Sequence, residues 1–244
     1  MSSSFPKKYP CRHTKFKAEY IPLAVHQLRD HLASMKWLIE ILIEEEAGKL
    51  NKDQKGLVKA VYESNKGMID LVNNLLNVFK IENGKMAVKP ELTDLVELSK
   101  RVIKQIKPLT EQKKQKFAFK ADGPLLPVKT DPVLIKHVIQ NVLSNAVQYT
   151  RPKGRIHFSL NLSDNNILFT IKDNGCGIPR KQQQSVFKKF FRADNAVKIK
   201  AEGNGLGLYI AKRIIKLLRG RIWFESVENK GSAFYFTLPL KRET

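Results

Sequence analysis

The sequence predicts an α+β protein in two parts: a long helical hairpin that forms a dimeric four-helix bundle, then an α/β sandwich with a mixed sheet. Between about residues 15 and 82, apolar residues recur at alternating steps of three and four, the spacing of helices that pack in bundles. From residue 85 onward, strand-like segments, several paired as hairpins, are mixed with amphipathic helical segments. We therefore expect a disordered basic arm at 1–14, the hairpin at 15–84 and the sandwich at 85–244.

Each helix of the hairpin carries one apolar stripe. On the first helix, expected over about 15–47, the stripe consists of Ile21, Val25, Leu28, Leu32, Met35, Ile39 and Leu42. On the second, expected over about 53–82, it consists of Val58, Val61, Asn65, Met68, Val72, Leu75 and Phe79. Because neighbouring apolar residues widen both stripes beyond what two helices can cover, we expect a homodimer. The alternative is a hairpin that packs on the second domain of its own chain.

In the second part, segments with the two-residue spacing of strands alternate with segments that have the spacing of helices. The expected elements are a strand at 86–92, a helix at 92–115 with Thr93 as N-cap, strands at 116–121 and 126–130, a helix at 131–150 that begins with Pro132, a hairpin at 155–173, a helix at 205–220 and a hairpin at 221–240. Because hairpins dominate, the sheet is expected to be mixed.

Composition narrows the class of protein. The longest apolar run is too short for a transmembrane segment, and the basic N-terminus lacks the apolar centre of a signal peptide. The two cysteines have no metal-type spacing, so we expect a cytoplasmic chain. The net charge of +21 raises the question of nucleic-acid binding, but no nucleic-acid motif is recognised and the lysines are spread along the chain. Nucleic acid is therefore an unlikely partner.

Three polar motifs lie in the second part. Asn141 and Asn145, four residues apart, share one helix face; their amide oxygens suit Mg²⁺, although such a pair is often only a polar surface. Asp173 follows a strand in "DNGCG", where it could accept a hydrogen bond from an adenine amino group or simply form an Asx turn. "GNGLGL" opens a helix and could hold phosphates. It departs from the Rossmann fingerprint because Leu208 replaces the third glycine.

Taken in order, "NVLSNA", "DNGCG", "VFKKFFR", "GNGLGL" and "GSAF" resemble the sensor histidine kinases, whose catalytic domain is of the GHKL type. The resemblance implies a set of ATP-binding residues: Asn141, Asn145, Tyr149, Asp173, Gly175, Gly177, Phe187, Phe190, Arg192, Gly203, Gly205, Leu206, Gly207, Leu208 and Ser232. It implies that Asn145 is the main Mg²⁺ ligand, that Asp173 reads adenine, and that residues 194–204 form a mobile lid. Gln148 departs from the family, where lysine is common beside the phosphates.

The hairpin then resembles the family's dimerisation and histidine phosphotransfer domain. Here "HQLRDHL" is similar to the family pattern H-E-L-R-T-P-L, which implies that His26 is the phosphoacceptor. Gln27, Asp30 and His31 replace the usual acid, threonine and proline. Gln27 can still accept a hydrogen bond from the imidazole, and Asp30, one turn on, can do so as well. His31 is a second, weaker candidate for the phosphoacceptor. The alternative for His26 is that it is an exposed histidine without a function.

The expected function is thus an ATP- and Mg²⁺-dependent histidine kinase that works as a homodimer. It would phosphorylate His26 and pass the phosphoryl group to a response regulator receiver domain. The altered residues after His26 leave an ATP-binding pseudokinase scaffold as the alternative. A nucleic-acid-binding ATPase is a third possibility that rests on charge alone.

Overall fold

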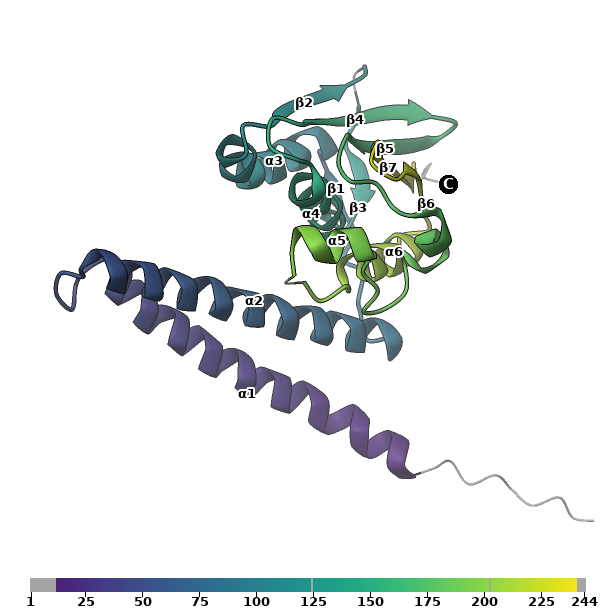
Figure 1. Ribbon diagram of the computed structural model, residues 1–244. Coiled ribbons are helices and arrows are strands. Elements are labelled where there is room, and N and C mark those ends of the chain that lie inside the picture. Colours follow the sequence, from purple (N-terminus) through teal and green to yellow (C-terminus); the bar gives the residue numbers. More distant parts are fainter. Residues whose placement is uncertain (1–11, 124, 202, 241–244) are drawn as a thin grey trace, which may run out of the picture. The chain divides into compact units, whose positions relative to one another are not determined.

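The computed structural model describes residues 12–123, 125–201 and 203–240, and its contacts divide the chain into two units (Figure 1). The helical unit covers Met1–Asn83 and the α/β unit covers Gly84–Thr244. The sequence placed this division one residue later. Residues 1–11, most of the expected basic arm, lie outside the described part; the helix begins at Arg12, within the range expected for the arm.

The helical unit is a hairpin of α1 (Arg12–Ile43) and α2 (Lys52–Glu82). α1 runs without interruption past His31, as expected where proline is missing from that place. In the connection, Glu45 and Gly48 adopt positive φ angles of 60° and 117°. Asn51 then begins α2 with a capping box, in which its side chain and that of Gln54 each bond the other's backbone N–H.

The hairpin buries only part of each predicted stripe. On α1, Val25, Leu32 and Ile39 are buried at seven-residue intervals, whereas the alternating members Leu28, Met35 and Leu42 are 53%, 44% and 38% exposed. On α2, Val61, Met68 and Leu75 are likewise 50%, 41% and 38% exposed, whereas Asn65 is buried and Val58, Val72 and Phe79 are half-buried. Each helix therefore turns one edge of its stripe to its neighbour, and the hairpin itself leaves the other edge uncovered.

A polar contact fixes the middle of the hairpin. Asn65 is 1% exposed, and its Nδ2 donates to the Leu32 carbonyl of α1 at 3.1 Å. One turn away, the Tyr62 hydroxyl donates to Glu40 at 3.1 Å. The two bonds hold α1 and α2 in one register, since a slip along the axis would leave the buried amide without its partner.

The α/β unit combines two sheets with helices. Its elements in order are β1 (Glu91–Thr93), α3 (Leu95–Gln112), β2 (Lys116–Ala121), β3 (Val128–Thr130), α4 (Pro132–Tyr149), β4 (Arg155–Ser163), β5 (Asn166–Asp173), the 3-10 helix η1 (Arg180–Ser185), α5 (Asp194–Ile199), α6 (Gly207–Leu217), β6 (Ile222–Val227) and β7 (Gly231–Pro239). The main sheet has the order β2-β4-β5-β7-β6, and β1 pairs with β3 in a small second sheet. β2 and β4 are parallel and the other neighbours are antiparallel, which confirms the predicted mixed sheet.

Helices α3, α4 and α6 cover one face of the main sheet (Figure 1). Phe158, Phe169 and Phe236 are wholly buried and lie in a row across the strands, with ring centroids 6.4 Å and 4.4 Å apart. α4 is the most buried helix of the unit and contacts both α3 and α6. It is therefore held rigidly, which matters because it carries the asparagine pair.

The structure corrects two details at the start of this unit. The strand expected at 86–92 is β1, which begins only at Glu91, directly after Pro90. Thr93 was expected to cap the following helix, but it is the last residue of β1 and its hydroxyl bonds the Glu91 carbonyl. Asp94 is the N-cap instead, since its carboxylate accepts the Glu97 N–H at 2.9 Å.

Candidate functional site

His26 lies on the exposed side of α1 and is paired with Asp30. Its Nδ1 is 2.8 Å from Asp30 Oδ2, and both side chains are about 60% exposed. Since a carboxylate only accepts hydrogen bonds, this contact places the ring proton on Nδ1 and leaves the Nε2 lone pair unprotonated in the neutral ring. The Gln27 side chain makes no hydrogen bond among the described residues. From the sequence, either Gln27 or Asp30 could accept a hydrogen bond from the imidazole of His26. In the structure this contact is made by Asp30, one helical turn away.

Asp173 ends β5 in a nearly closed position. It is 8% exposed, and its Oδ1 accepts the N–H groups of Gly175 at 2.8 Å and Ser232 at 3.4 Å. Burial raises the pKa of this carboxyl to about 6, although the two backbone N–H groups oppose the rise. No hydrogen bond among the described residues reaches Oδ2. This oxygen is therefore available to a donor such as an adenine amino group.

The glycines after Asp173 are required by close backbone contacts. A Cβ atom at Gly175 would lie 2.4 Å from the Tyr149 carbonyl oxygen. Gly177 has a φ of +62°, and a Cβ atom there would lie 2.0 Å from the Val227 carbonyl oxygen. The loop after β5 is consequently pressed between the end of α4 and the β6–β7 turn.

Asn141, the first residue of the asparagine pair of α4, faces the start of α6 at Gly207. A Cβ atom at Gly207 would meet Asn141 Oδ1 at 3.3 Å, and Asn141 Nδ2 is buried without a partner. Asn145, one turn on, makes no hydrogen bond among the described residues. A buried amide without a partner is costly in a finished protein, so this place is suited to a polar ligand.

The glycine loop itself is shaped by positive φ angles. Gly203 and Gly205 have φ values of +148° and +63°, and α6 begins at Gly207, two residues later than predicted. Leu206 is wholly buried beneath the loop and Leu208 is half-buried on α6. The backbone N–H groups at the start of α6 therefore follow directly on the loop, as a phosphate-binding turn requires.

Two predicted aromatic residues lie away from this place. Phe187 packs against Phe224 of β6, with centroids 5.8 Å apart, and Lys212 lies over its ring. Phe190 is 62% exposed with a positive φ of 60°. A Cβ atom at Gly205 would lie 2.7 Å from the Phe190 carbonyl carbon, so Phe190 meets the loop through its backbone.

The segment predicted as a lid contains the short helix α5. Asn195 of this helix donates to the carbonyls of Cys176 at 3.2 Å and Gly177 at 3.0 Å. At the other end, the Arg192 guanidinium donates to the carbonyls of Lys200, Ala201 and Gly203. Arg192 therefore braces the segment that runs from α5 to the glycine loop.

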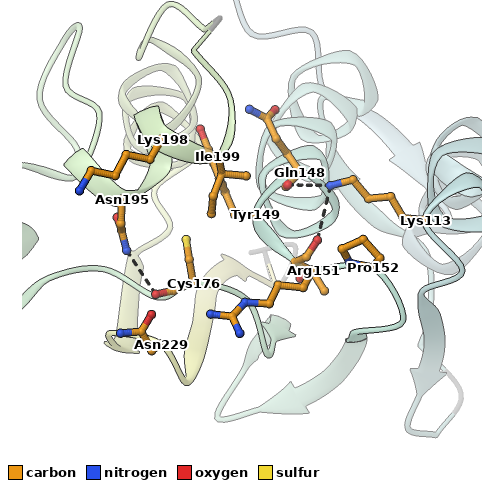
Figure 2. A pocket seen from close by; sticks show the side chains of 11 residues that line it. Lys113, Gln148, Tyr149, Arg151, Pro152, Cys176, Asn195, Lys198, Ile199 and Asn229 are labelled. Atoms are coloured by element: carbon orange, nitrogen blue, oxygen red, sulfur yellow. Dashed lines mark hydrogen bonds between the residues drawn. The ribbon is translucent and has the colours of Figure 1, made fainter.

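A hollow of about 310 Å³ lies beside the loop after β5 (Figure 2). It is lined by Lys113, Gln148, Tyr149, Thr150, Arg151, Pro152, Cys176, Asn195, Lys198, Ile199 and Asn229. Tyr149 is the one member of the predicted ATP-binding set among these residues, and Asp173 lies outside the lining. The hollow is thus bounded by the end of α4, which carries Tyr149, and by α5.

Sequence reasoning missed Lys113, the residue that follows α3, whose side chain reaches the end of α4 (Figure 2). Its ammonium donates to the carbonyls of Val147 at 2.9 Å and Gln148 at 2.7 Å, and so neutralises the negative end of α4. Burial lowers the pKa of Lys113, and Lys200 nearby lowers it further. Lys113 and Lys198 supply positive charge where Gln148 supplies none.

The residues fit ATP and a metal ion that is shared with its phosphates. Asp173 Oδ2 offers an acceptor, the glycine loop offers N–H groups, and Asn145 offers an amide oxygen of the kind that Mg²⁺ accepts. Among the described residues, no group of three or more His, Cys, Asp or Glu side chains could hold a metal. An ion at this site therefore has to take most of its ligands from the nucleotide and water.

Two protein families match the chain. Residues 17–84 match the His Kinase A (phospho-acceptor) domain, and residues 130–242 match the histidine kinase-, DNA gyrase B- and HSP90-like ATPase. The chain is 34% identical over 227 residues to the sensor protein kinase WalK of Staphylococcus aureus, covering 91% of this chain and 54% of that protein. Against other WalK proteins it covers 36%, so it spans a third to a half of these relatives.

Solved structures agree on the fold. Full-length ShkA in complex with AMPPNP aligns with a TM-score of 0.76 at 22% identity, over 93% of this chain and 47% of that chain. The catalytic domain of the histidine kinase ThkA aligns with a TM-score of 0.55 at 29% identity, over 64% of this chain and 97% of that one. In the part of the chain that the structure describes, none of the helices has the length and apolar character needed to cross a bilayer. With a phosphoacceptor hairpin followed by a GHKL-type ATPase domain, the chain belongs to the sensor histidine kinases.

Proposed function

We propose that the chain is the core of an ATP-dependent protein histidine kinase in a two-component system. It phosphorylates His26 and then passes the phosphoryl group to an aspartate of a response regulator receiver domain. The observation that carries this proposal is the 2.8 Å contact between His26 Nδ1 and Asp30, which leaves Nε2 as the exposed nucleophile. It also weakens the pseudokinase alternative, because an acid is present beside the histidine after all.

In the proposed reaction, the Nε2 lone pair of His26 attacks the γ-phosphorus of ATP in line with the bond to the β-phosphate oxygen. That bond breaks, ADP leaves, and the ring becomes positively charged with its proton still on Nδ1. The Asp30 carboxylate stabilises this charge, since it already accepts that proton in a hydrogen bond. Most of the remaining rate acceleration comes from positioning and charge neutralisation, as in phosphoryl transfer generally.

We assign the nucleotide to the residues around Asp173. Asp173 Oδ2 accepts from the adenine amino group, and the loop from Gly203 to Gly207 contacts the phosphates. Mg²⁺, when bound, neutralises phosphate charge, with Asn145 as its main protein ligand and Asn141 beside it. Support comes from the unpaired buried Nδ2 of Asn141 and the free Oδ2 of Asp173.

We infer that the chain works as a homodimer through the helical unit. The uncovered edge of each stripe supports this: six apolar side chains on α1 and α2, at seven-residue intervals, are between 38% and 53% exposed. Burying them requires two further helices, and a second copy of the hairpin supplies these with the same spacing. The four helices then form one bundle.

The partner surface includes Trp37, which is 63% exposed on α1. Trp37 lies eleven residues after His26, close to three helical turns, so it shares the face of His26 and Asp30. An exposed tryptophan in line with the reactive histidine suits a receiver domain that must reach that histidine, because tryptophan is enriched at energetic centres of interfaces. Since the donor is ATP and the acceptor a receiver domain, we place the reaction in the cytoplasm.

The proposal is tested with radiolabelled ATP and a chemical assay of the product. The wild-type chain should acquire label that is labile to acid and stable to base. His26→Gln should abolish this label while nucleotide binding persists, and the matched control His31→Gln, five residues on, should retain it. Nucleotide binding without any acid-labile label in the wild type would support the pseudokinase scaffold instead.

A further inference from the structure

The positive charge of this chain is concentrated in the α/β unit. Residues 84–244 contain 31 Lys and Arg residues against 13 Asp and Glu residues, a net charge of +18, whereas residues 1–83 have a net charge of +3. Binding one triphosphate accounts for only a few of these cations. The remaining cations indicate a possible anion-binding surface only where several of them lie close together without acidic partners.

Helix α3 separates its basic residues into two kinds. Lys100 and Lys107 are paired on the same helix, with Nζ atoms 3.8 Å from Glu97 and 3.6 Å from Glu111. These exposed pairs at i,i+3 and i,i+4 spacing occupy the acidic residues that lie within α3.

The other two basic residues of this face, Arg101 and Lys104, have no salt bridge or hydrogen bond through their side chains among the described residues. They line a second hollow of about 360 Å³, together with Lys136 of α4. Leu98, 3% exposed, and Gln105 complete the lining. Lys136 likewise has no acidic partner in the described chain. All charged groups that line this hollow are therefore cations.

This hollow is separate from the nucleotide site. Gln140 of α4 donates to Gln105 of α3 at 2.8 Å, which ties these helices together beside the hollow. The next residue, Asn141, points instead to Gly207 at the start of α6. Because Gln140 and Asn141 lie on different faces of α4, the hollow and the asparagine pair open in different directions.

We propose that the hollow lined by Arg101, Lys104 and Lys136 is a binding site for a small oligophosphate, distinct from the ATP site. Its volume falls near the lower end of small-ligand sites. Three cations that converge without a carboxylate repel one another, and a compact multiply charged anion relieves that repulsion. A guanidinium fork can bind two phosphate oxygens at once, and each lysine adds a point charge. The inference does not depend on kinase activity.

The test measures the binding of tripolyphosphate to the full chain by isothermal titration calorimetry. AMPPNP is present throughout to fill the ATP site. The test variant is Arg101→Gln/Lys136→Gln. The matched control is Lys100→Gln/Lys107→Gln, which removes the same charge from the paired positions. We expect the test variant to weaken tripolyphosphate binding by at least about tenfold and the control by less than about threefold. Autophosphorylation should be unchanged in both.

Two further arms separate the sources of the phosphate. If the hollow binds GTP no more tightly than tripolyphosphate, its ligand is a bare oligophosphate. If it binds GTP more tightly, its ligand is a nucleotide. Either result supports the site. Equal losses in the two variants would overturn it, because the effect would then be diffuse charge. The proposal would also be overturned if the chain did not bind tripolyphosphate in the presence of AMPPNP. Binding of a single-stranded RNA instead of tripolyphosphate would overturn it as well.

Discussion

His26 Nδ1 and Asp30 Oδ2 lie 2.8 Å apart on one face of α1. In the family pattern, an acid follows the phosphoacceptor directly, but here that place is taken by Gln27. The carboxylate beside the histidine therefore comes from Asp30, one helical turn on, and not from the next residue. Asp30 is thus a positioning residue that selects one tautomer of the imidazole, and the Nε2 atom is left for the phosphoryl group.

Replacing Asp30 should slow autophosphorylation. Asp30→Asn keeps the size of the side chain but removes its charge, and we expect the rate to fall about three- to tenfold, in line with the modest strength of an exposed ion pair. The check is the autophosphorylation rate of both proteins at saturating ATP together with their ATP affinity, since a loss at the reacting ring lowers the rate and leaves ATP affinity unchanged. A faster Asp30→Asn variant would contradict the assignment.

The same carboxylate should disfavour removal of phosphate from the regulator. Its negative charge repels the aspartyl phosphate of a docked receiver domain and orients water poorly. Asp30→Thr should therefore lower autophosphorylation and speed the decay of a phosphorylated regulator. Both rates are measured with the same regulator; an unchanged decay would remove this second role and leave the first.

Dimerisation should depend on the uncovered half of the stripes. Leu28→Asp and Leu75→Asp place a charge among side chains that are apolar and exposed within one chain, so we expect monomers by sedimentation at micromolar concentration. Trp37→Asp is the matched control, because Trp37 is also large and exposed but lies on the opposite face of α1. A wild-type chain that sediments as a monomer would disprove the bundle.

Trp37 should matter for transfer rather than for autophosphorylation. Removing the ring with Trp37→Ala should lower the rate of phosphotransfer to a receiver domain at least about tenfold, the usual effect of truncating a central interface tryptophan. The rate at which His26 acquires label should stay within about twofold. Phosphotransfer at the wild-type rate would show that the partner docks elsewhere.

Asp173 should show a conflict between stability and binding. Its pKa is raised from 3.8 to about 6 in the folded protein, so the folded state loses stability as the pH rises through this interval. Asp173→Asn removes the buried charge, and the variant should be more stable at pH 7.5 by on the order of 1–3 kcal/mol but not at pH 3.5. Urea unfolding followed by Trp223 fluorescence, with Trp37→Phe in both proteins, measures this in the α/β unit.

Nucleotide binding should change in the opposite sense. Asp173→Asn should lose ATP, because its one carbonyl oxygen stays with the Gly175 and Ser232 N–H groups and a donor NH2 group replaces the Oδ2 acceptor. In the wild type, ATP affinity should weaken as the pH falls below about 6, where Asp173 becomes protonated. Affinity that is independent of pH between 5 and 7.5 would exclude Asp173 as the adenine acceptor.

Several features were determined by the sequence alone, because they depend on local spacing. The helical stripes, the strand alternation and the hairpin across "SDNN" were read correctly; in that turn, Asp164 and Asn165 adopt the positive φ angles that such residues tolerate. Asp30 could be placed beside His26 because a helix brings residues four apart onto one face.

Where two residues both suited a local role, the sequence was ambiguous. Thr93 and Asp94 are both good N-caps, and the choice fell to Asp94 because β1 pairs with β3 as far as Thr93. Gln27 and Asp30 could both accept from the imidazole, and the contact went to the residue whose side chain lies over the same face. Such choices follow from neighbours that a local pattern does not contain.

Only the tertiary structure decided which residues meet across long separations. It set Ser232 against Asp173, 59 residues apart, and Lys113 against the end of α4, 35 residues from Gln148. It split each apolar stripe into a buried and an uncovered edge, and it gathered three cations of α3 and α4 around one hollow. Periodicity fixes the face of an element, but burial and charge balance depend on what packs against that face.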